Sequence, residues 1–210
     1  MSESIAPSRA RATVQAFSSK RDSPDVEGEP DDEKQHDERH SKILESIQPK
    51  SSLALKAHLD RDPGAVWVDC SSPTWLREEV YWRAKVFQRE FGYDMTQWEI
   101  KGHHDPSAVG FVFHDPEFRI IGACCFRPNS PQSKEVRLDW IWLCPKVRRC
   151  GLASSQWEKF RSRFGAFLIV GPISKAMSNF LSLRFPGHKV LNPNIHDPKL
   201  PMERFSSSGT

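Results

Sequence analysis

Apolar positions between about residue 65 and residue 191 recur with periods that alternate between those of strands and helices. A short apolar run at 65–68 predicts a strand. Apolar side chains at helical spacing then predict a helix from about residue 73 to Phe91, which Gly92 ends as a natural C-terminal residue. Two apolar runs at 109–114 and 119–126 predict a hairpin, because Asp-Pro-Glu between them favours a turn.

The second half of the chain continues this alternation. Another apolar run at 136–143 predicts a strand, and an apolar stripe at helical spacing predicts a helix that Gly165 ends. The stripe consists of Ala153, Trp157, Phe160 and Phe164. A buried strand at 166–170, a helix capped by Ser174 and a weak strand at 189–191 complete the order. The order predicts an α/β (α+β) fold with a mixed sheet, in which the unit across 136–170 is a parallel crossover.

The first 50 residues have a different composition, rich in Ser, Pro, Asp, Glu and Lys. They cannot bury enough apolar surface to offset the entropy of ordering, so we predict a disordered tail at 1–50. Its net charge is +3 over 1–21 and −7 over 22–45, which leaves +7 for 46–210. We therefore expect a basic domain at 51–195 and a flexible C-terminal tail at 196–210. Such a domain suits anionic ligands, although ordinary solubility charge explains the same number.

The five cysteines are odd in number and lack zinc-knuckle spacing, which favours reduced thiols in the cytoplasm. His36 and His40 lie four residues apart among carboxylates, where a solvated charge run is favoured over a metal site. We expect no metal. No apolar run approaches the length of a membrane span, so no membrane partner is expected.

The segment Arg148–Ala153 carries the clearest chemical signal. A strand that turns through an Arg/Gly loop into a helix presents backbone N–H groups and the positive end of the helix dipole to an anion. Glycine at 151 lets the backbone approach a ligand, and the guanidinium groups of Arg148 and Arg149 can pair with phosphates. The alternative is a plain helix-entry turn with a solvated pair of arginines.

This loop and the element order resemble the GNAT superfamily of acyl-CoA N-acyltransferases. Its signature, Q/R-x-x-G-x-G/A, is matched by Arg148, Gly151 and Ala153, and Leu143-Cys144-Pro145 matches the frequent family context. The second half is also similar to the catalytic domains of cohesin acetyltransferases. The resemblance implies a GNAT-like, mostly antiparallel central sheet with flanking helices. It also implies that acetyl-CoA is the acyl-donor substrate, with its pantetheine arm along the fourth strand beside a bulge. The implied binding residues are Ile141, Trp142, Leu143, Arg148, Arg149, Cys150, Gly151, Leu152 and Ala153.

Acyl transfer from a thioester to an amine needs a base for the amine and a proton for the leaving thiolate. Asp139 is the candidate base, because it lies in an otherwise apolar strand where burial would strengthen it as a base. An ion pair with Arg127 or Arg137 is an equally good reading. The resemblance implies a tyrosine acid in the last helix, but both tyrosines, Tyr81 and Tyr93, come early. The acid is then Ser178 or water, or no group takes this role. Cys144 and Cys150 allow an acyl-cysteine route, but buried cysteine is common packing material.

We therefore expect an N-acetyltransferase that moves an acetyl group from acetyl-CoA to a primary amine by direct attack in a ternary complex. The alternative is a catalytically silent acyl-CoA-binding or protein-interaction module, which the absent late tyrosine and short C-terminal sheet favour. The amine is a protein lysine or a small molecule. Nucleic acid is disfavoured, since no reading motif is present. A partner that completes the C-terminal edge of the sheet is a further expectation.

Overall fold

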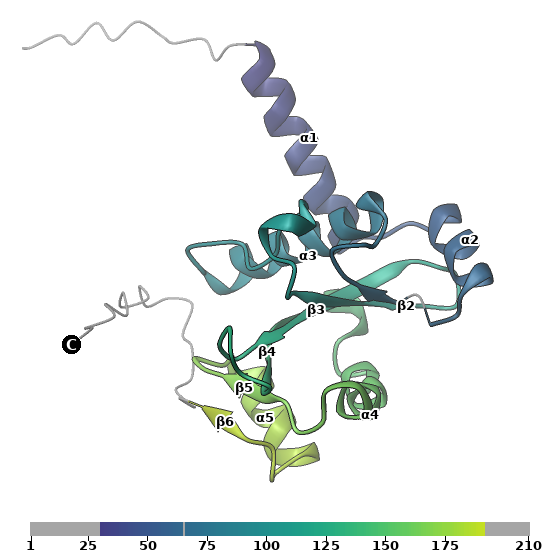
Figure 1. The fold of residues 1–210 in the computed structure, drawn as a ribbon. Helices are drawn as coiled ribbons and strands as arrows, with labels where there is room; N and C mark the ends of the chain where they lie inside the picture. Colours follow the sequence, from purple (N-terminus) through teal and green to yellow (C-terminus); the bar gives the residue numbers. More distant parts are fainter. Residues whose placement is uncertain (1–29, 65, 192–210) are drawn as a thin grey trace, which may run out of the picture.

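The computed structural model describes residues 30–64 and 66–191, whose six strands form one sheet in the order β1-β2-β3-β4-β5-β6 (Figure 1). The first four strands pair antiparallel, whereas β4–β5 and β5–β6 pair parallel. The predicted mixed, mostly antiparallel sheet is therefore confirmed, including the parallel crossover from β4 to β5. The strands are β1 Trp67–Val68, β2 Val109–His114, β3 Ile120–Pro128, β4 Val136–Leu143, β5 Leu168–Val170 and β6 Val190–Leu191.

Helices cover both faces of the sheet (Figure 1). On one face α3 packs against β3 and β4, with α1 against α3. On the other face α4 packs its aromatic stripe against the strands, and α5 contacts α4 through Phe180 and Trp157, whose rings are 5.0 Å apart. None of the described helices is both long and apolar enough to cross a membrane. The helices are α1 Pro30–Ile47, α2 Leu53–Arg61, α3 Thr74–Phe91, α4 Leu152–Phe164 and α5 Lys175–Arg184, with single 3-10 turns η1 Gly102–His104 and η2 Pro145–Val147.

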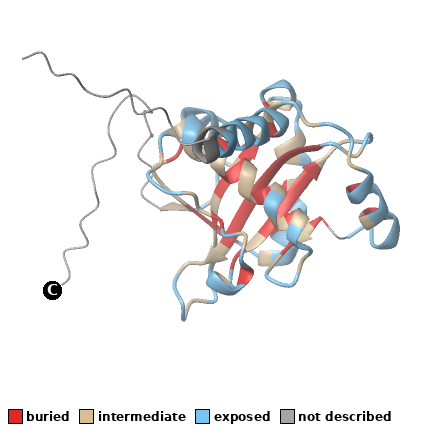
Figure 2. Ribbon diagram, turned by 90° about the horizontal axis from the view of Figure 1, so that it is seen from above, coloured by how far each residue is buried: buried red, intermediate tan, exposed pale blue. Residues whose placement is uncertain are grey.

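The most aromatic part of the core lies between α4 and the sheet. Phe160 is fully buried, and its ring lies 5.1 Å from the rings of both Phe111 and Phe126. Buried residues concentrate along the strands, while the outer helix faces are exposed (Figure 2). The predicted helix ends are also confirmed, because Gly92 and Gly165 both take a positive φ, of 68° and 70°. This rigid sheet fixes the position of β4.

The prediction of a disordered tail to residue 50 is wrong for residues 30–47, which form α1. Residues 34–42 of α1 are exposed, and the charged composition of this segment led to the prediction. Only the last turns of α1 pack: Ser46 is buried, and Ile43 and Ile47 lie against the core. These side chains contact the core from a helix whose mean composition is polar, which composition alone does not reveal. The predicted tails at 1–29 and 196–210 lie outside the described residues.

Candidate functional site

The central feature of the site is the gap that opens between β4 and β5. β5 pairs only with Arg137 and Leu138 at the start of β4, so the rest of β4 diverges from it. A bulge lies at this point, because Cys125 and Phe126 of β3 oppose Trp140 and Leu138 and leave Asp139 as the extra residue. The predicted bulge and splay are therefore confirmed.

The backbone of β4 presents hydrogen-bonding groups along this gap. The amide of Cys144 donates to the Ile121 oxygen of β3 at 2.8 Å. Because such bonds alternate along an antiparallel strand, the amides of Trp142 and Trp140 also face β3. Those of Ile141 and Leu143 then face the opposite edge, toward the gap. This edge can pair with an extended ligand in the manner of an added strand.

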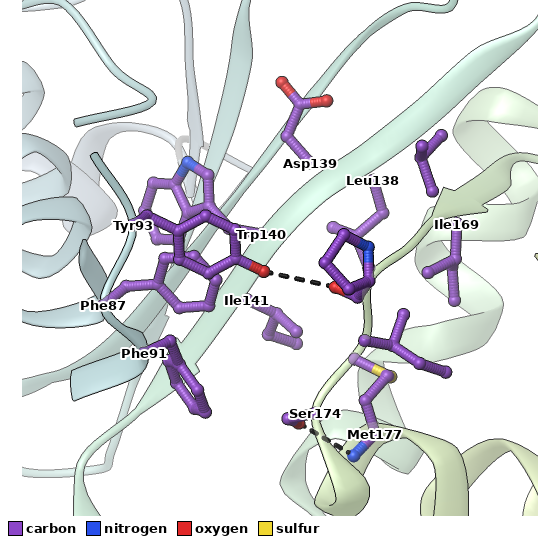
Figure 3. A pocket seen from close by; sticks show the side chains of 13 residues that line it. Phe87, Phe91, Tyr93, Leu138, Asp139, Trp140, Ile141, Ile169, Ser174 and Met177 are labelled. Carbon is purple, nitrogen blue, oxygen red and sulfur yellow. Dashed lines mark hydrogen bonds between the residues drawn. The ribbon is translucent and has the colours of Figure 1, made fainter. Parts of the chain in front are cut away.

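A cavity lies in the gap, which we call the inner cavity (Figure 3). One wall is formed by β4 and by aromatic side chains at the end of α3. The other wall is formed by β5, the turn after it and the start of α5. The lining residues are Phe87, Phe91, Tyr93, Leu138, Asp139, Trp140, Ile141, Ile169, Val170, Pro172, Ile173, Ser174 and Met177.

A groove of about 400 Å³ continues past the end of β4, between the N-terminus of α4 and one side of α5; we call it the α4–α5 groove. Five of the nine residues predicted to bind the acyl donor line it, namely Leu143, Arg149, Gly151, Leu152 and Ala153. Ile141 lines the inner cavity instead. Across the groove lie Ala176, Asn179, Phe180, Leu183 and Arg184 of α5.

The N-terminus of α4 meets the requirements of an anion site. Gly151 is the N-cap residue, and no side chain caps the first turn. The first amides of a helix have no partner within it, so those of α4 are available to a ligand. Gly151 has φ 80°, and a Cβ there would meet no atom within 4 Å. This backbone conformation therefore favours glycine, and the space beside it is open to a ligand.

Arg148 is held away from this groove by α3. Its two Nη atoms donate to the carboxylate of Glu90 at 2.6 and 2.7 Å, and its Nε donates to the Leu143 oxygen at 2.8 Å. The indole of Trp142 donates to the same carboxylate at 2.8 Å. Arg148 and Trp142 thus brace the loop against α3. Their predicted contact with acyl-CoA stays a prediction, whereas Arg149 is exposed at the groove itself.

Glu90 should make stability depend on pH. Burial alone raises the pKa of Glu90, but hydrogen bonds from Arg148 and Trp142 outweigh it and lower the pKa below 4.5. A lowered pKa contributes stability that is present above the unfolded value and is lost as pH falls through the folded value. We expect Glu90→Gln to reduce the free energy of unfolding by about 1 kcal/mol at pH 7.

The measurement is urea unfolding of both proteins between pH 7 and pH 3. The difference between wild type and Glu90→Gln should shrink as the pH falls below 4.5. A difference that stays constant through this range would contradict the ion-pair assignment.

Asp139 is buried at a cavity, as expected of a base, and is also paired with arginines, as expected of a structural carboxylate. Its side chain is 8% exposed and lines the inner cavity. It also forms ion pairs with Arg127 and, at 2.6 Å, with Arg137. In Figure 3 its carboxylate points away from the centre of the inner cavity. Arg127 is fully engaged, since it also donates to Asp105 at 2.6 Å and to the Gln97 backbone oxygen at 3.2 Å.

A second, larger cavity of about 480 Å³ lies outside the gap, on the side of Arg127 and Arg137; we call it the outer cavity. It shares Tyr93, Asp139, Val170 and Pro172 with the inner cavity. Its other lining residues are Met95, Thr96, Gln97, Trp98, Glu99, Arg127, Arg137 and Gly171. Asp139 and Tyr93 therefore lie where the two cavities meet.

The remaining candidates are Ser178, Ser174 and two cysteines, and of these only Ser174 lines the inner cavity. Ser178 lines neither cavity, and Ser174 caps α5 as predicted, because its hydroxyl accepts from the Met177 amide at 3.1 Å. Cys144 is buried and directed at the Ser46 oxygen, and burial raises the pKa of its thiol, as expected for packing. Cys150 is exposed beside the loop. Within the described residues no group of three or more His, Cys, Asp or Glu side chains could hold a metal.

The sequence prediction did not assign Tyr93. It follows Gly92 after α3, and its hydroxyl reaches across the inner cavity to donate to the Pro172 oxygen at 3.2 Å (Figure 3). The signal available in the sequence was only that Gly92 turns the chain, which does not reveal where the next side chain points.

The chain was compared with known proteins. No protein-family model and no curated protein sequence matches it. Among solved structures it is similar to Tetrahymena GCN5, with 18% identity over 39% of this chain and 51% of that one and a TM-score of 0.32. It is similar to the xEco2 acetyltransferase domain bound to a CoA conjugate, with 16% identity over 60% and 89% and a TM-score of 0.47. A mutant BH1408 protein from Bacillus halodurans gives 14% identity over 56% and 90%, with a TM-score of 0.39. The chain thus spans about half of the GCN5 chain, and these likenesses concern the fold alone.

Proposed function

We propose that this protein is an N-acetyltransferase, which transfers the acetyl group of acetyl-CoA to a primary amine by direct attack in a ternary complex. The observation that carries the proposal is the arrangement of three spaces along β4. The α4–α5 groove, the inner cavity and the outer cavity follow one another beside the open edge of this strand. A donor entering from one end and an amine from the other would meet at Asp139 and Tyr93.

Acetyl-CoA fits the first two spaces by its chemistry. The pyrophosphate would bind the free amides at the N-terminus of α4, supported by the side chains of Arg149 and Arg184. The pantetheine arm would pair with the backbone of Ile141 and Leu143 at the open edge of β4. The thioester would then lie in the inner cavity.

The amine would approach through the outer cavity. Its ammonium form has a pKa near ~10.4 for a lysine side chain and must lose a proton before attack. Asp139 is proposed to take this proton, because its carboxylate lies at the junction of the two cavities. Glu99 is exposed at the outer cavity and adds negative charge that favours a cationic acceptor. A protein lysine and a small-molecule amine both satisfy this chemistry.

The proposal predicts that Arg149→Glu weakens acetyl-CoA binding by about 100-fold, because a charge that attracts the phosphates becomes one that repels them. The measurement is isothermal titration with acetyl-CoA. Arg39→Glu is the matched control, since it makes the same charge change at an exposed residue of α1, which lies on the other side of the sheet from α4 and α5 (Figure 1). Wild-type affinity in Arg149→Glu would contradict the proposed donor site.

A catalytically silent acyl-CoA-binding module is the second candidate. Two observations favour it: Asp139 is held by two arginines, and the described sheet ends at the two-residue strand β6. A thiol-release assay with a panel of amines and lysine peptides separates the two functions. Acetyl-CoA binding without thiol release from any acceptor would select the silent module.

Two smaller proposals follow from the same features. The outer edge of β6 pairs with no strand of the described chain, so a partner that adds a strand there could complete the acceptor side. The five cysteines are free thiols, which is consistent with a proposed location in the reducing cytoplasm.

A further inference from the structure

Tyr93 is held firmly in the inner cavity by both of its ends. Gly92, with φ 68°, turns the chain after α3 and lays the Tyr93 ring against Phe87, with ring centroids 5.1 Å apart and nearly parallel planes. The hydroxyl donates to the Pro172 oxygen on the opposite wall at 3.2 Å (Figure 3). The phenol therefore spans the inner cavity between α3 and the turn that precedes α5.

The position of Tyr93 matters because four residues line both cavities: Tyr93, Asp139, Val170 and Pro172. Only the first two have side chains that can transfer a proton. The Asp139 carboxylate accepts hydrogen bonds from Arg127 and Arg137 and is directed away from the centre of the inner cavity. Tyr93 is then the one proton donor that points into the inner cavity from this junction, among the residues that the structure describes.

Burial raises the pKa of the Tyr93 phenol above its usual value of 10.0. The phenol therefore keeps its proton at neutral pH and is able to donate it. Ser178, the acid candidate from the sequence, lines neither cavity. A serine hydroxyl is also a far weaker acid than a phenol, so geometry and chemistry both favour Tyr93 over Ser178.

We propose that Tyr93 is the catalytic residue that protonates the departing sulfur of CoA, an inference that rests on the proposed acetyl transfer. The neutral amine nitrogen forms a bond to the thioester carbon, and the carbon–sulfur bond breaks with its electron pair on sulfur. The Tyr93 hydroxyl gives its proton to that sulfur. The nitrogen then loses its second proton to Asp139, which has already passed the ammonium proton to solvent. Asp139 returns this second proton through solvent to the Tyr93 phenolate. Amide and free CoA thiol leave, and both side chains regain their starting states.

The test is Tyr93→Phe, which removes only the hydroxyl and keeps the ring that stacks on Phe87. We expect kcat to fall by about 100-fold or more, as for loss of a general acid, while the Kd for acetyl-CoA stays unchanged. Tyr81→Phe is the matched control, because Tyr81 is the other tyrosine, lies on α3 and lines neither cavity. It should retain the kcat of wild type.

A second readout separates proton donation from a purely structural role. Placing 3-fluorotyrosine at position 93 preserves the hydrogen bond to Pro172 but makes the phenol more acidic. The alkaline limb of the kcat profile, which reports loss of the acid's proton, should move to lower pH.

The outcomes distinguish this inference from the proposed function. Wild-type protein that binds no acetyl-CoA, or releases no thiol with any amine, overturns the acetyltransferase proposal itself. Wild-type turnover with an equal kcat in Tyr93→Phe overturns only the role of Tyr93. A fall in kcat with an unmoved alkaline limb in the fluorotyrosine protein also overturns proton donation.

Discussion

Gly151→Glu should abolish measurable acetyl-CoA binding and leave a folded protein. The new side chain would extend into the open space beside Gly151, at the mouth of the α4–α5 groove, where its carboxylate occupies the anion site. The repulsion between this carboxylate and a phosphate bound beside it reduces the binding free energy by about 3 kcal/mol, which corresponds to a loss of about 100-fold in affinity. Displacement of the ligand from the amides of the first turn of α4 adds to this loss.

The other end of the same helix provides the control. Gly165 has φ 70°, close to the 80° of Gly151, and a Cβ there would likewise meet no atom within 4 Å. Gly165→Glu introduces the same side chain, but the backbone strain differs, because Gly151 is left-handed helical (ψ 1°) whereas Gly165 has ψ −143°, a conformation nearly confined to glycine. The strain is about 1–2 kcal/mol at Gly151 and larger at Gly165. An acidic residue is favourable at a helix N-terminus and unfavourable at a C-terminus, so Gly165→Glu should be the less stable of the two proteins.

Isothermal titration and thermal unfolding of both variants give the test. We expect Gly151→Glu to lose binding with the smaller loss of stability, and Gly165→Glu to bind like wild type with the larger loss. Equal affinities in the two variants would remove the anion site from the N-terminus of α4, and with it the proposed donor position.

The parts of this site that the sequence predicts are those encoded by neighbouring residues. The loop from Arg148 to Ala153 is continuous, lies between a clear strand and a clear amphipathic helix, and carries its own glycine. The apolar stripe of α4 is equally local, and the structure buries Trp157 and Phe160 completely. Both features follow from periodicity and turn chemistry alone.

The parts that the sequence does not predict depend on contacts between distant segments. Arg148 is 58 residues from Glu90, and Tyr93 is 79 residues from Pro172. No local pattern encodes such pairs, so the phosphate role of Arg148 and the acid role of Ser178 were the natural predictions. The structure adds two contacts to these predictions, which stay predictions: Glu90 braces the loop, and Tyr93 enters the cleft from the opposite wall. A residue early in the chain is therefore not far from the cleft, because α3 packs beside β4.

Asp139→Asn tests the remaining ambiguity, because Asp139 is both a candidate base and the partner of two arginines. We expect the free energy of unfolding to fall by about 1.5–3 kcal/mol, since the variant weakens buried, charge-assisted hydrogen bonds from Arg127 and Arg137. We also expect kcat to fall by about 100-fold or more, since an amide cannot accept the proton of the amine.

Asp105→Asn separates these two effects. Asp105 also forms an ion pair with Arg127, at 2.6 Å, and its side chain is 22% exposed, but it lines neither the inner nor the outer cavity. It should therefore share much of the stability loss, measured by urea unfolding, and keep the turnover of wild type. An equal fall in kcat in both variants would show that Asp139 acts by fixing Arg127. Because the acidic limb of the kcat profile reports the base, that limb should persist in Asp105→Asn and disappear in Asp139→Asn if Asp139 takes the proton.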